Sequence, residues 1–196
     1  MNTKIIDMNE LAERAREFRN AGKKLVVTNG CFDLLHVGHV RCLKAARALG
    51  DALAIGLNSD RSVRALKGVG RPLNNERDRA EVLAALEFVD FVTIFPEIRA
   101  TRFIEATRPA VYAKGGDYTS ETLDAEEKTV LREIGAEVRI LPFVQGCSTS
   151  GLPNEVTYPP FHRITLPQLL SIQLEPRNFK RDGPDYDKRF SRKPSG

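Results

Sequence analysis

The sequence of this 196-residue chain predicts an α/β fold, a Rossmann-like doubly wound sheet of five parallel strands with helices on both faces. Apolar runs of four to six residues alternate along residues 1–141 with segments of helical period. This alternation is typical of a parallel sheet covered on both faces, in which ligands bind at the carboxyl ends of the strands. An irregular C-terminal tail is expected to follow the sheet.

The predicted elements follow one another in order along the chain. The first is a helix that presents Leu11, Ala15 and Phe18 on one face. We expect strands at residues 25–28, 52–57, 91–95, 110–113 and 137–141, and helices at 9–19, 38–49, 61–66, 76–86, 101–106 and 123–134. Glycines and a proline at residues 68–72 predict a loop.

The character of the chain changes after residue 150. Residues 1–150 are predicted to form one domain. Seven of the 11 prolines lie in residues 151–196, and proline disfavours regular helix. We therefore predict a Pro-rich irregular extension at residues 151–176. Residues 177–196 hold seven Lys and Arg residues against three Asp, which predicts a basic, disordered tail.

The formal charge of +4 belongs to that tail. Residues 1–176 hold 23 of the 30 basic residues and 23 of the 26 acidic residues, so the domain is not expected to bind nucleic acid. No apolar stretch is long enough to span a bilayer, and the N-terminus lacks the apolar centre of a signal peptide. Three cysteines at unrelated spacings fit reduced thiols. We expect a cytoplasmic protein that does not bind membranes.

Two histidines in one turn give the strongest functional signal. His36 and His39 follow the first predicted strand and open the next helix, where they point the same way. Gly38 between them removes a Cβ, and the helix N-terminus offers free N–H groups to an anion. We predict a phosphate site with two donors facing developing negative charge. The alternatives are histidines that pack or cap a buried loop, and a metal site, for which no third ligand cluster is evident.

Cationic side chains near helix ends are further candidates. Lys67 precedes Gly68 at the end of a predicted helix, in a loop that is able to fold over phosphates. Arg79 precedes the buried face of the next helix and is a stronger candidate than Arg77. A solvated side chain is the alternative for Lys67. Cys31 lies inside the proposed site, but without a neighbouring base we interpret it as a small packing residue.

Two loops that follow strands complete the candidate site. Lys114, Gly115, Gly116 and Asp117 come directly after the fourth strand, where paired glycines allow close approach of a ligand and Asp117 is able to accept from hydroxyls or organise Mg²⁺. A tight turn is the alternative. Ser148 and Thr149 follow the last strand and offer hydroxyls and N–H groups to phosphate oxygens, with ordinary N-capping as the alternative.

Together these segments resemble the HxGH nucleotidyltransferase superfamily, the cytidylyltransferase-like enzymes, and within it the adenylyltransferase domains of the ADP-heptose synthase family. The resemblance covers about residues 8–150. The matching stretches are residues 28–39, 56–60, 66–68, 71–74, 79, 89–90, 114–118 and 146–149. The ordered series is more specific than the two histidines alone.

The resemblance implies that AMP is transferred from ATP to D-glycero-β-D-manno-heptose 1-phosphate, giving ADP-heptose, a lipopolysaccharide core precursor, and pyrophosphate. The catalytic residues would be His36, His39, Lys67 and Arg79, with the histidines stabilising charge on the phosphates and the two cations holding them. The nucleotide would be bound by Asn29, Gly30, Cys31, Phe32, Asp33, Gly38, Lys114, Gly115, Gly116, Asp117, Ser148 and Thr149. The acceptor substrate would be bound by Asn58, Asp60 and Arg71.

The resemblance also implies a cofactor and partners. Mg²⁺ is expected with ATP, with Asp33 orienting the site or its metal, although the sequence does not identify the metal ligands. A separate heptose kinase is expected to supply the sugar phosphate, and a homodimer is suggested. Members of the family usually have Ser-Thr-Thr followed by a helix. Here Ser150 and Gly151 follow Thr149, and Pro153 is expected to end such a helix within a turn.

Two alternatives stay open at this point, and a third is excluded. A cytidylyltransferase acting on glycerol phosphate or ethanolamine phosphate would share the scaffold and the phosphate chemistry. A nucleotide-binding partner protein without catalysis is a hypothesis of another class, suggested by the altered segment after Thr149. Class I aminoacyl-tRNA synthetases also have a His-x-Gly-His turn, but this chain is too short and its domain too neutral to bind tRNA.

Overall fold

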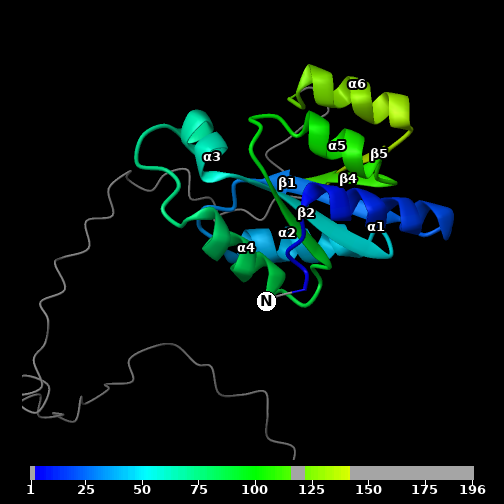
Figure 1. The fold of residues 1–196 in the computed structure, drawn as a ribbon, viewed down its shortest axis with the longest axis horizontal. Coiled ribbons are helices and arrows are strands. Elements are labelled where there is room, and N and C mark those ends of the chain that lie inside the picture. The colour runs from blue at the N-terminus through cyan, green and yellow to red at the C-terminus, as the bar shows by residue number, and fades with distance from the viewer. Residues whose placement is uncertain (1–2, 116–121, 142–196) are drawn as a thin grey trace, which may run out of the picture. The chain divides into compact units, whose positions relative to one another are not determined.

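Five parallel strands form the centre of the molecule (Figure 1). The computed structural model describes residues 3–115 and 122–141. The strands are β1 (Leu25–Gly30), β2 (Ala52–Asn58), β3 (Phe91–Phe95), β4 (Val111–Lys114) and β5 (Glu137–Ile140), in the order β3-β2-β1-β4-β5. The strand order reverses between β1 and β4. In a doubly wound sheet, the ligand crevice opens where the order reverses.

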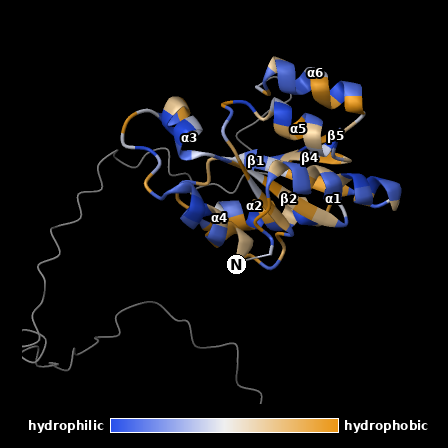
Figure 2. Cartoon of the chain, viewed as in Figure 1, coloured by the Kyte–Doolittle hydropathy of each residue, from blue (hydrophilic) through white to orange (hydrophobic). Residues whose placement is uncertain are grey.

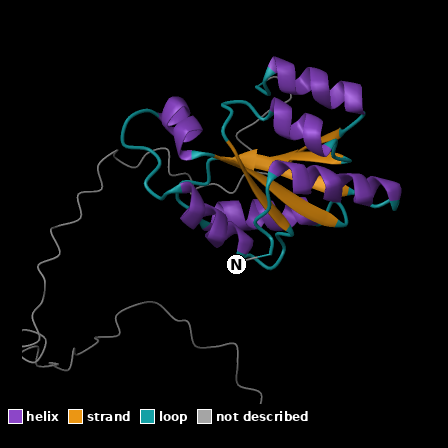
Figure 3. Cartoon of the chain, viewed as in Figure 1, coloured by secondary structure: helices purple, strands orange, loops and turns teal. Residues whose placement is uncertain are grey.

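Helices cover both faces of the sheet (Figure 3). The described helices are α1 (Met8–Asn20), α2 (Val37–Arg47), α3 (Asp60–Lys67), α4 (Glu76–Ala84), α5 (Thr101–Thr107) and α6 (Ala125–Ile134). Apolar residues of α2 and α4 pack on one face of the sheet, and those of α1, α5 and α6 pack on the other. Because side chains alternate along a strand, Val26 points to the first layer and Val27 to the second.

The predicted fold class is confirmed, and the differences lie at the ends of the elements. The strand predicted at residues 25–28 continues through Asn29 and Gly30, because these two residues pair with Gly56 and Leu57 of β2. Two motif residues therefore belong to the sheet and not to the loop after it. The extension predicted at residues 151–176 and the tail at 177–196 lie outside the described residues.

Side-chain caps determine where the helices begin. Ser59 Oγ accepts a hydrogen bond from the Ser62 N–H at the start of α3. Asn75 Oδ1 accepts from the N–H groups of Arg77 and Asp78 at the start of α4. Such caps satisfy backbone donors that have no partner within the helix. They fix the starts of the two helices that carry Lys67 and Arg79.

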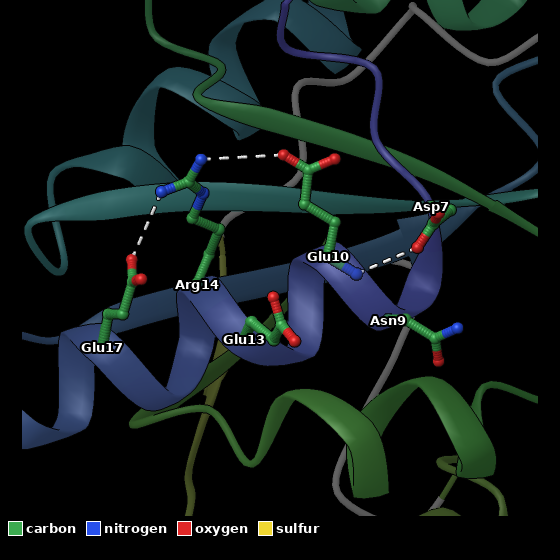
Figure 4. A pocket seen from close by; sticks show the side chains of 6 residues that line it. All are labelled: Asp7, Asn9, Glu10, Glu13, Arg14 and Glu17. Carbon is green, nitrogen blue, oxygen red and sulfur yellow. Dashed lines mark hydrogen bonds and ion pairs between the residues drawn. The ribbon is translucent and has the colours of Figure 1, made fainter.

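The outward face of α1 is charged, while its inward face is apolar (Figure 2). Leu11 and Ala15 are fully buried. On the solvent side, Arg14 lies 3.7 Å from a Glu10 carboxylate oxygen and 3.4 Å from one of Glu17, and Asp7 caps the helix (Figure 4). Such exposed pairs stabilise a helix by about 0.3–0.5 kcal/mol each, so apolar burial holds α1 in place.

Residues 4–6 cover the outer edge of β3. The Ile6 N–H donates to the Val92 carbonyl at 3.0 Å, and the Val92 N–H donates to the Lys4 carbonyl at 2.8 Å. Val92 of the edge strand therefore has both of its backbone groups paired, which hinders association through this edge. Among the described residues, no helix combines the length and the apolar character needed to cross a bilayer.

Candidate active site

The two histidines lie together at the start of α2. His36 is the N-cap residue and has extended backbone geometry, and His39 lies in the first turn. The His36 N–H donates to His39 Nδ1 at 3.4 Å, and the centroids of the two rings are 3.8 Å apart with an angle of 32° between their planes. The rings of Phe32 and His39 pack edge to face, and their centroids are 5.3 Å apart. The predicted arrangement, two imidazoles pointing the same way at a helix N-terminus, is present.

His39 is neutral at physiological pH. Burial is the largest cause, and together with the nearby His36 and the Lys67 cation it lowers the pKa of His39 from 6.5 to about 4. Since Nδ1 accepts the His36 N–H, the proton of the neutral ring resides on Nε2, which is then a donor. In the described part of the chain, the buried Nδ1 of His36 has no hydrogen-bond partner. The two histidines thus keep hydrogen-bonding nitrogens for a ligand.

Three cationic side chains act on the loop that precedes the histidines. Lys67 of α3, Arg79 of α4 and Lys114 of β4 all exert an electrostatic effect on the thiol of Cys31. Burial is the largest influence and raises the pKa of Cys31, so the thiol is protonated at neutral pH. Cys31 is half-buried. This agrees with its interpretation as a packing residue, in a region of positive potential suited to phosphates.

Asp33 joins the loop after β1 to the segment between α3 and α4. Its carboxylate accepts from Arg71 Nη1 at 2.8 Å and from the Leu73 N–H at 2.7 Å. The side chains of Asp33 and Arg71 are 2% and 8% exposed. Burial alone would raise the pKa of Asp33, but the hydrogen bonds from Arg71 and from the backbone of Leu73 and Asn74 lower it overall. Both carboxylate oxygens are therefore engaged within the protein.

Arg79 connects three separate segments at the same edge of the sheet. Its Nη2 pairs with Asp60 Oδ1 at 2.8 Å, its Nε donates to the Asn74 carbonyl at 3.0 Å, and its Nη1 donates to the Cys31 carbonyl. The Arg79 side chain is 1% exposed. Each nitrogen of the guanidinium thus has an acceptor in the protein, so Arg79 fixes the Cys31 loop against α3 and α4.

The predicted acceptor-binding residues are engaged in contacts within the protein. Arg71 pairs with Asp33, and Asp60 pairs with Arg79. Asn58 Nδ2 donates to the Glu97 carbonyl at 3.3 Å. The structure brings all three to the carboxyl-end side of β1 and β2 and gives each a positioning contact. Their direct contact with a substrate stays a prediction.

A second polar cluster lies where β1 and β4 meet. Asn29 Oδ1 lies 2.6 Å from Lys114 Nζ and 2.7 Å from the Tyr112 hydroxyl. That hydroxyl is also 3.0 Å from Glu127 Oε2 of α6. Lys114 is buried, and burial lowers its pKa, while Glu127 and Cys31 act to raise it. Asn29 and Lys114, both predicted to bind the nucleotide, are thus held at the crevice between these strands.

Sequence reasoning missed Tyr112, Glu127 and Asn74. A signal for Glu127 was present, because Leu123, Glu127 and Leu131 recur at a spacing of four on the buried side of α6, where a carboxylate is unexpected. The predicted ligands Gly116, Asp117, Ser148 and Thr149 lie outside the described residues. Gly115 is described, and a Cβ placed there would lie 3.5 Å from Cys42 Sγ, an ordinary contact.

The described side chains do not form a metal site of their own. Residues 3–115 and 122–141 contain no group of three His, Cys, Asp or Glu residues arranged around a common point. Asp33 already accepts from Arg71 and Leu73. In these parts of the chain, Asp33 therefore serves as an anchor for the loop, and its suggested role toward Mg²⁺ stays a prediction.

Comparison with known families agrees with this geometry. The family model described as cytidylyltransferase-like matches residues 27–169, which include most of β1, the histidine turn and the cations Lys67, Arg79 and Lys114. The chain belongs to the cytidylyltransferase-like family. The predicted resemblance is confirmed, and with it the assignment of a nucleotidyltransferase domain.

Relatives of this cytidylyltransferase-like chain include proteins named bifunctional protein HldE. The one from Geotalea uraniireducens (strain Rf4) is 49% identical over 155 residues, which are 79% of this chain and 31% of the relative. The one from Bradyrhizobium sp. (strain ORS 278) is 52% identical over 150 residues, or 76% of this chain and 30% of the relative. The chain thus spans about a third of the length of these relatives.

A solved structure shares the fold of this cytidylyltransferase-like domain. It is described as the lipopolysaccharide core biosynthesis protein from Thermoplasma volcanium GSS1. The similarity has a TM-score of 0.53 with 27% sequence identity, and it covers 63% of this chain and 98% of the other.

Proposed function

We propose that this protein transfers AMP from ATP to D-glycero-β-D-manno-heptose 1-phosphate and releases pyrophosphate. The observation that carries the proposal is the paired His36 and His39 at the start of α2, beside the cations that act on the Cys31 loop. The choice of nucleotide and acceptor rests on the resemblance of residues 8–150 to the adenylyltransferase domains of the ADP-heptose synthase family. The anomeric oxygen of the acceptor already carries phosphate, and we expect a separate sugar kinase to supply it.

In the proposed reaction, a phosphate oxygen of the acceptor attacks the α-phosphorus of ATP in line. The new O–P bond forms as the bond from the α-phosphorus to the leaving pyrophosphate breaks. The negative charge that moves onto the bridging oxygen and the pyrophosphate is stabilised by donors already in place. We assign this role to the His39 Nε2–H, to His36 and to Lys67.

The remaining side chains act by holding the loop and the neighbouring helices in place. Arg79 and Asp33 hold the loop that carries Cys31 and Phe32, and their contacts with Asp60 and Arg71 keep α3 and α4 at the edge of the crevice. Lys114 and Asn29 lie on the nucleotide side, where β1 and β4 diverge. This division agrees with phosphoryl-type transfer, in which catalysis is mostly orientation and electrostatics. Mg²⁺ bound to ATP would neutralise part of the phosphate charge.

The test is pyrophosphate release by the purified protein with Mg²⁺, crossing ATP and CTP against heptose 1-phosphate and glycerol 3-phosphate. We expect release only with ATP and heptose 1-phosphate. His36→Ala should lower kcat about a hundredfold to a thousandfold, the usual effect of removing one such donor. Arg41→Ala is the matched control, because it removes a polar side chain from an exposed position of the same helix.

Each other outcome contradicts a defined part of the proposal. Release with CTP and glycerol 3-phosphate would overturn the substrate and leave the transfer chemistry in place. Tight ATP binding without release in any pairing would favour the non-catalytic nucleotide-binding protein. An equal loss in His36→Ala and Arg41→Ala would remove the histidine from the mechanism. A homodimer stays a prediction, which the elution volume of the active fraction tests.

A further inference from the structure

A buried carboxylate lies on the sheet side of α6, away from the histidines. Glu127 is 5% exposed, between Leu123 and Leu131 on the same side of the helix. Its Oε1 accepts from the Ala100 N–H at 2.9 Å, and its Oε2 lies 3.0 Å from the Tyr112 hydroxyl. A carboxylate in such apolar surroundings is costly unless its charge is compensated. Two neutral donors alone are weak compensation for a full charge.

A series of buried polar groups leads from this carboxylate to the crevice. The single proton of the Tyr112 hydroxyl has two acceptors within reach, Glu127 Oε2 and Asn29 Oδ1, and it is donated to one of them at a time. The Tyr112 hydroxyl lies 2.7 Å from Asn29 Oδ1, and Lys114 Nζ donates to the same oxygen at 2.6 Å. Asn29 is near the end of β1, and Lys114 is the last residue of the neighbouring β4. The series therefore ends at the point where the sheet opens for a ligand.

The two ends of the series carry opposite charges. Lys114 is 4% exposed, and its ammonium group lies 5.2 Å from the centroid of the Tyr112 ring. Burial lowers the pKa of Lys114, whereas the Glu127 carboxylate is the first of two groups that raise it. The other is Cys31, from the loop after β1. Glu127 thus favours the charged form of a lysine that lies at the end of β4, beside Asn29 of β1.

We propose that Glu127 is a positioning residue, which acts through Tyr112 and Asn29 to keep Lys114 charged and directed toward the phosphates of the nucleotide. Glu127 itself does not contact the substrate. The inference deepens the proposed function, on which it rests for the identity of the ligand. It also gives a role to a carboxylate that folding alone does not favour, because an apolar residue of similar size would pack on α6 without the cost of desolvation.

The direct test is the titration of Lys114 followed by NMR in protein labelled with ¹³C at lysine Cε, with the signal assigned by its absence from Lys114→Arg. Glu127→Gln keeps the shape and an acceptor for the Ala100 N–H but removes the charge. We expect the pKa of Lys114 to fall by on the order of one unit in this variant. Glu126→Gln is the matched control, because it removes the same charge from an exposed neighbouring position on α6.

A second measurement relates the titration to ligand binding. The dissociation constant for ATP should rise as Lys114 loses its proton, so the alkaline decline in affinity should begin at lower pH in Glu127→Gln than in the wild type. Tyr112→Phe, which interrupts the series and keeps the carboxylate, should give a smaller change in the same direction. Measuring all variants with Cys31→Ser removes a second titratable group that acts on Lys114.

The outcomes separate this inference from the proposed function. An unchanged Lys114 titration in Glu127→Gln, or an equal change in Glu126→Gln, would overturn the inference. The titration needs no turnover, so a shifted Lys114 in a protein that releases no pyrophosphate would support the inference and contradict the proposed function. A shifted titration with an unshifted pH profile of ATP binding would overturn the connection to the nucleotide.

Discussion

At the scale of single residues, the site is held by charges that satisfy one another inside the protein. Asp33 with Arg71, and Asp60 with Arg79, are ion pairs in which at least one side chain is almost fully buried. A buried pair contributes little net stability, but removal of one partner leaves an uncompensated charge. Such pairs therefore act mainly by fixing the positions of the loops that they join.

The pair of Asp33 and Arg71 permits a quantitative prediction. Arg71→Met should lower the free energy of unfolding at pH 7 by about 3–5 kcal/mol, because Asp33 stays buried without its partner. The pKa of Asp33 is lowered in the folded protein, so its contribution is present above the unfolded pKa near 3.8 and is lost as the pH falls through the lower, folded value. Urea unfolding at pH 7 and at pH 3 should therefore show a smaller loss at pH 3.

A matched control separates this effect from the loss of any arginine. Arg139 pairs with Glu137 at 2.6 Å on β5, with both side chains more than half exposed. Arg139→Met should change stability by about 0–1 kcal/mol, since exposed pairs contribute little. If both variants lose the same free energy of unfolding, the buried pair of Asp33 and Arg71 does not hold the loop in place.

The same residues show what the sequence was able to predict about the site. The histidine turn was predicted because both residues lie within one helical turn, and local geometry fixes how they point. The ion-pair partners of Asp33 and Arg79 were not predicted, because Arg71 is 38 residues from Asp33 and Asp60 is 19 residues from Arg79. A charged residue in a loop looks the same in the sequence whether it meets a ligand or a buried counter-charge.

At the scale of elements, the period of apolar residues predicted every described strand and helix. Their ends were less predictable, because they depend on side-chain caps and on strand pairing. The helix predicted at residues 123–134 begins at Ala125, where Asp124 caps the N–H groups of Glu126 and Glu127. The cap also fixes the rotation of α6, and so points Glu127 toward the sheet.

The cap of α4 gives a prediction at this scale. Asn75 Oδ1 accepts from two backbone N–H groups at 3.0 Å, and the helix that it begins carries Arg79. Asn75→Ala should lower the free energy of unfolding by about 1 kcal/mol, the usual value of an N-cap. Asn75→Ser, which keeps an acceptor, should retain most of that stability in thermal or urea unfolding. Equal losses in the two variants would mean that the cap does not hold the helix.

At the scale of the whole molecule, the distribution of charge separates the domain from the end of the chain. Residues 1–176 hold 23 basic and 23 acidic residues, so the full excess of +4 lies in residues 177–196. The described site nevertheless contains the cations Lys67, Arg79 and Lys114, of which Arg79 is paired with Asp60. We therefore expect the crevice, and not residues 177–196, to attract a nucleotide phosphate. Surface charges act over only about 8 Å at physiological salt.

This separation predicts that residues 177–196 are dispensable for catalysis. A chain that ends at residue 176 has no net formal charge and keeps every residue assigned to the site. Its kcat and KM for pyrophosphate release should match those of the full chain at physiological salt, because Lys67 of α3 and Lys114 of β4, the cations proposed to act on the phosphates, lie outside the deleted segment. The two proteins should be compared at several salt concentrations. A rise in KM that disappears at high salt would mean that the tail attracts the substrates electrostatically, and a fall in kcat at all salt concentrations would mean that it completes the site.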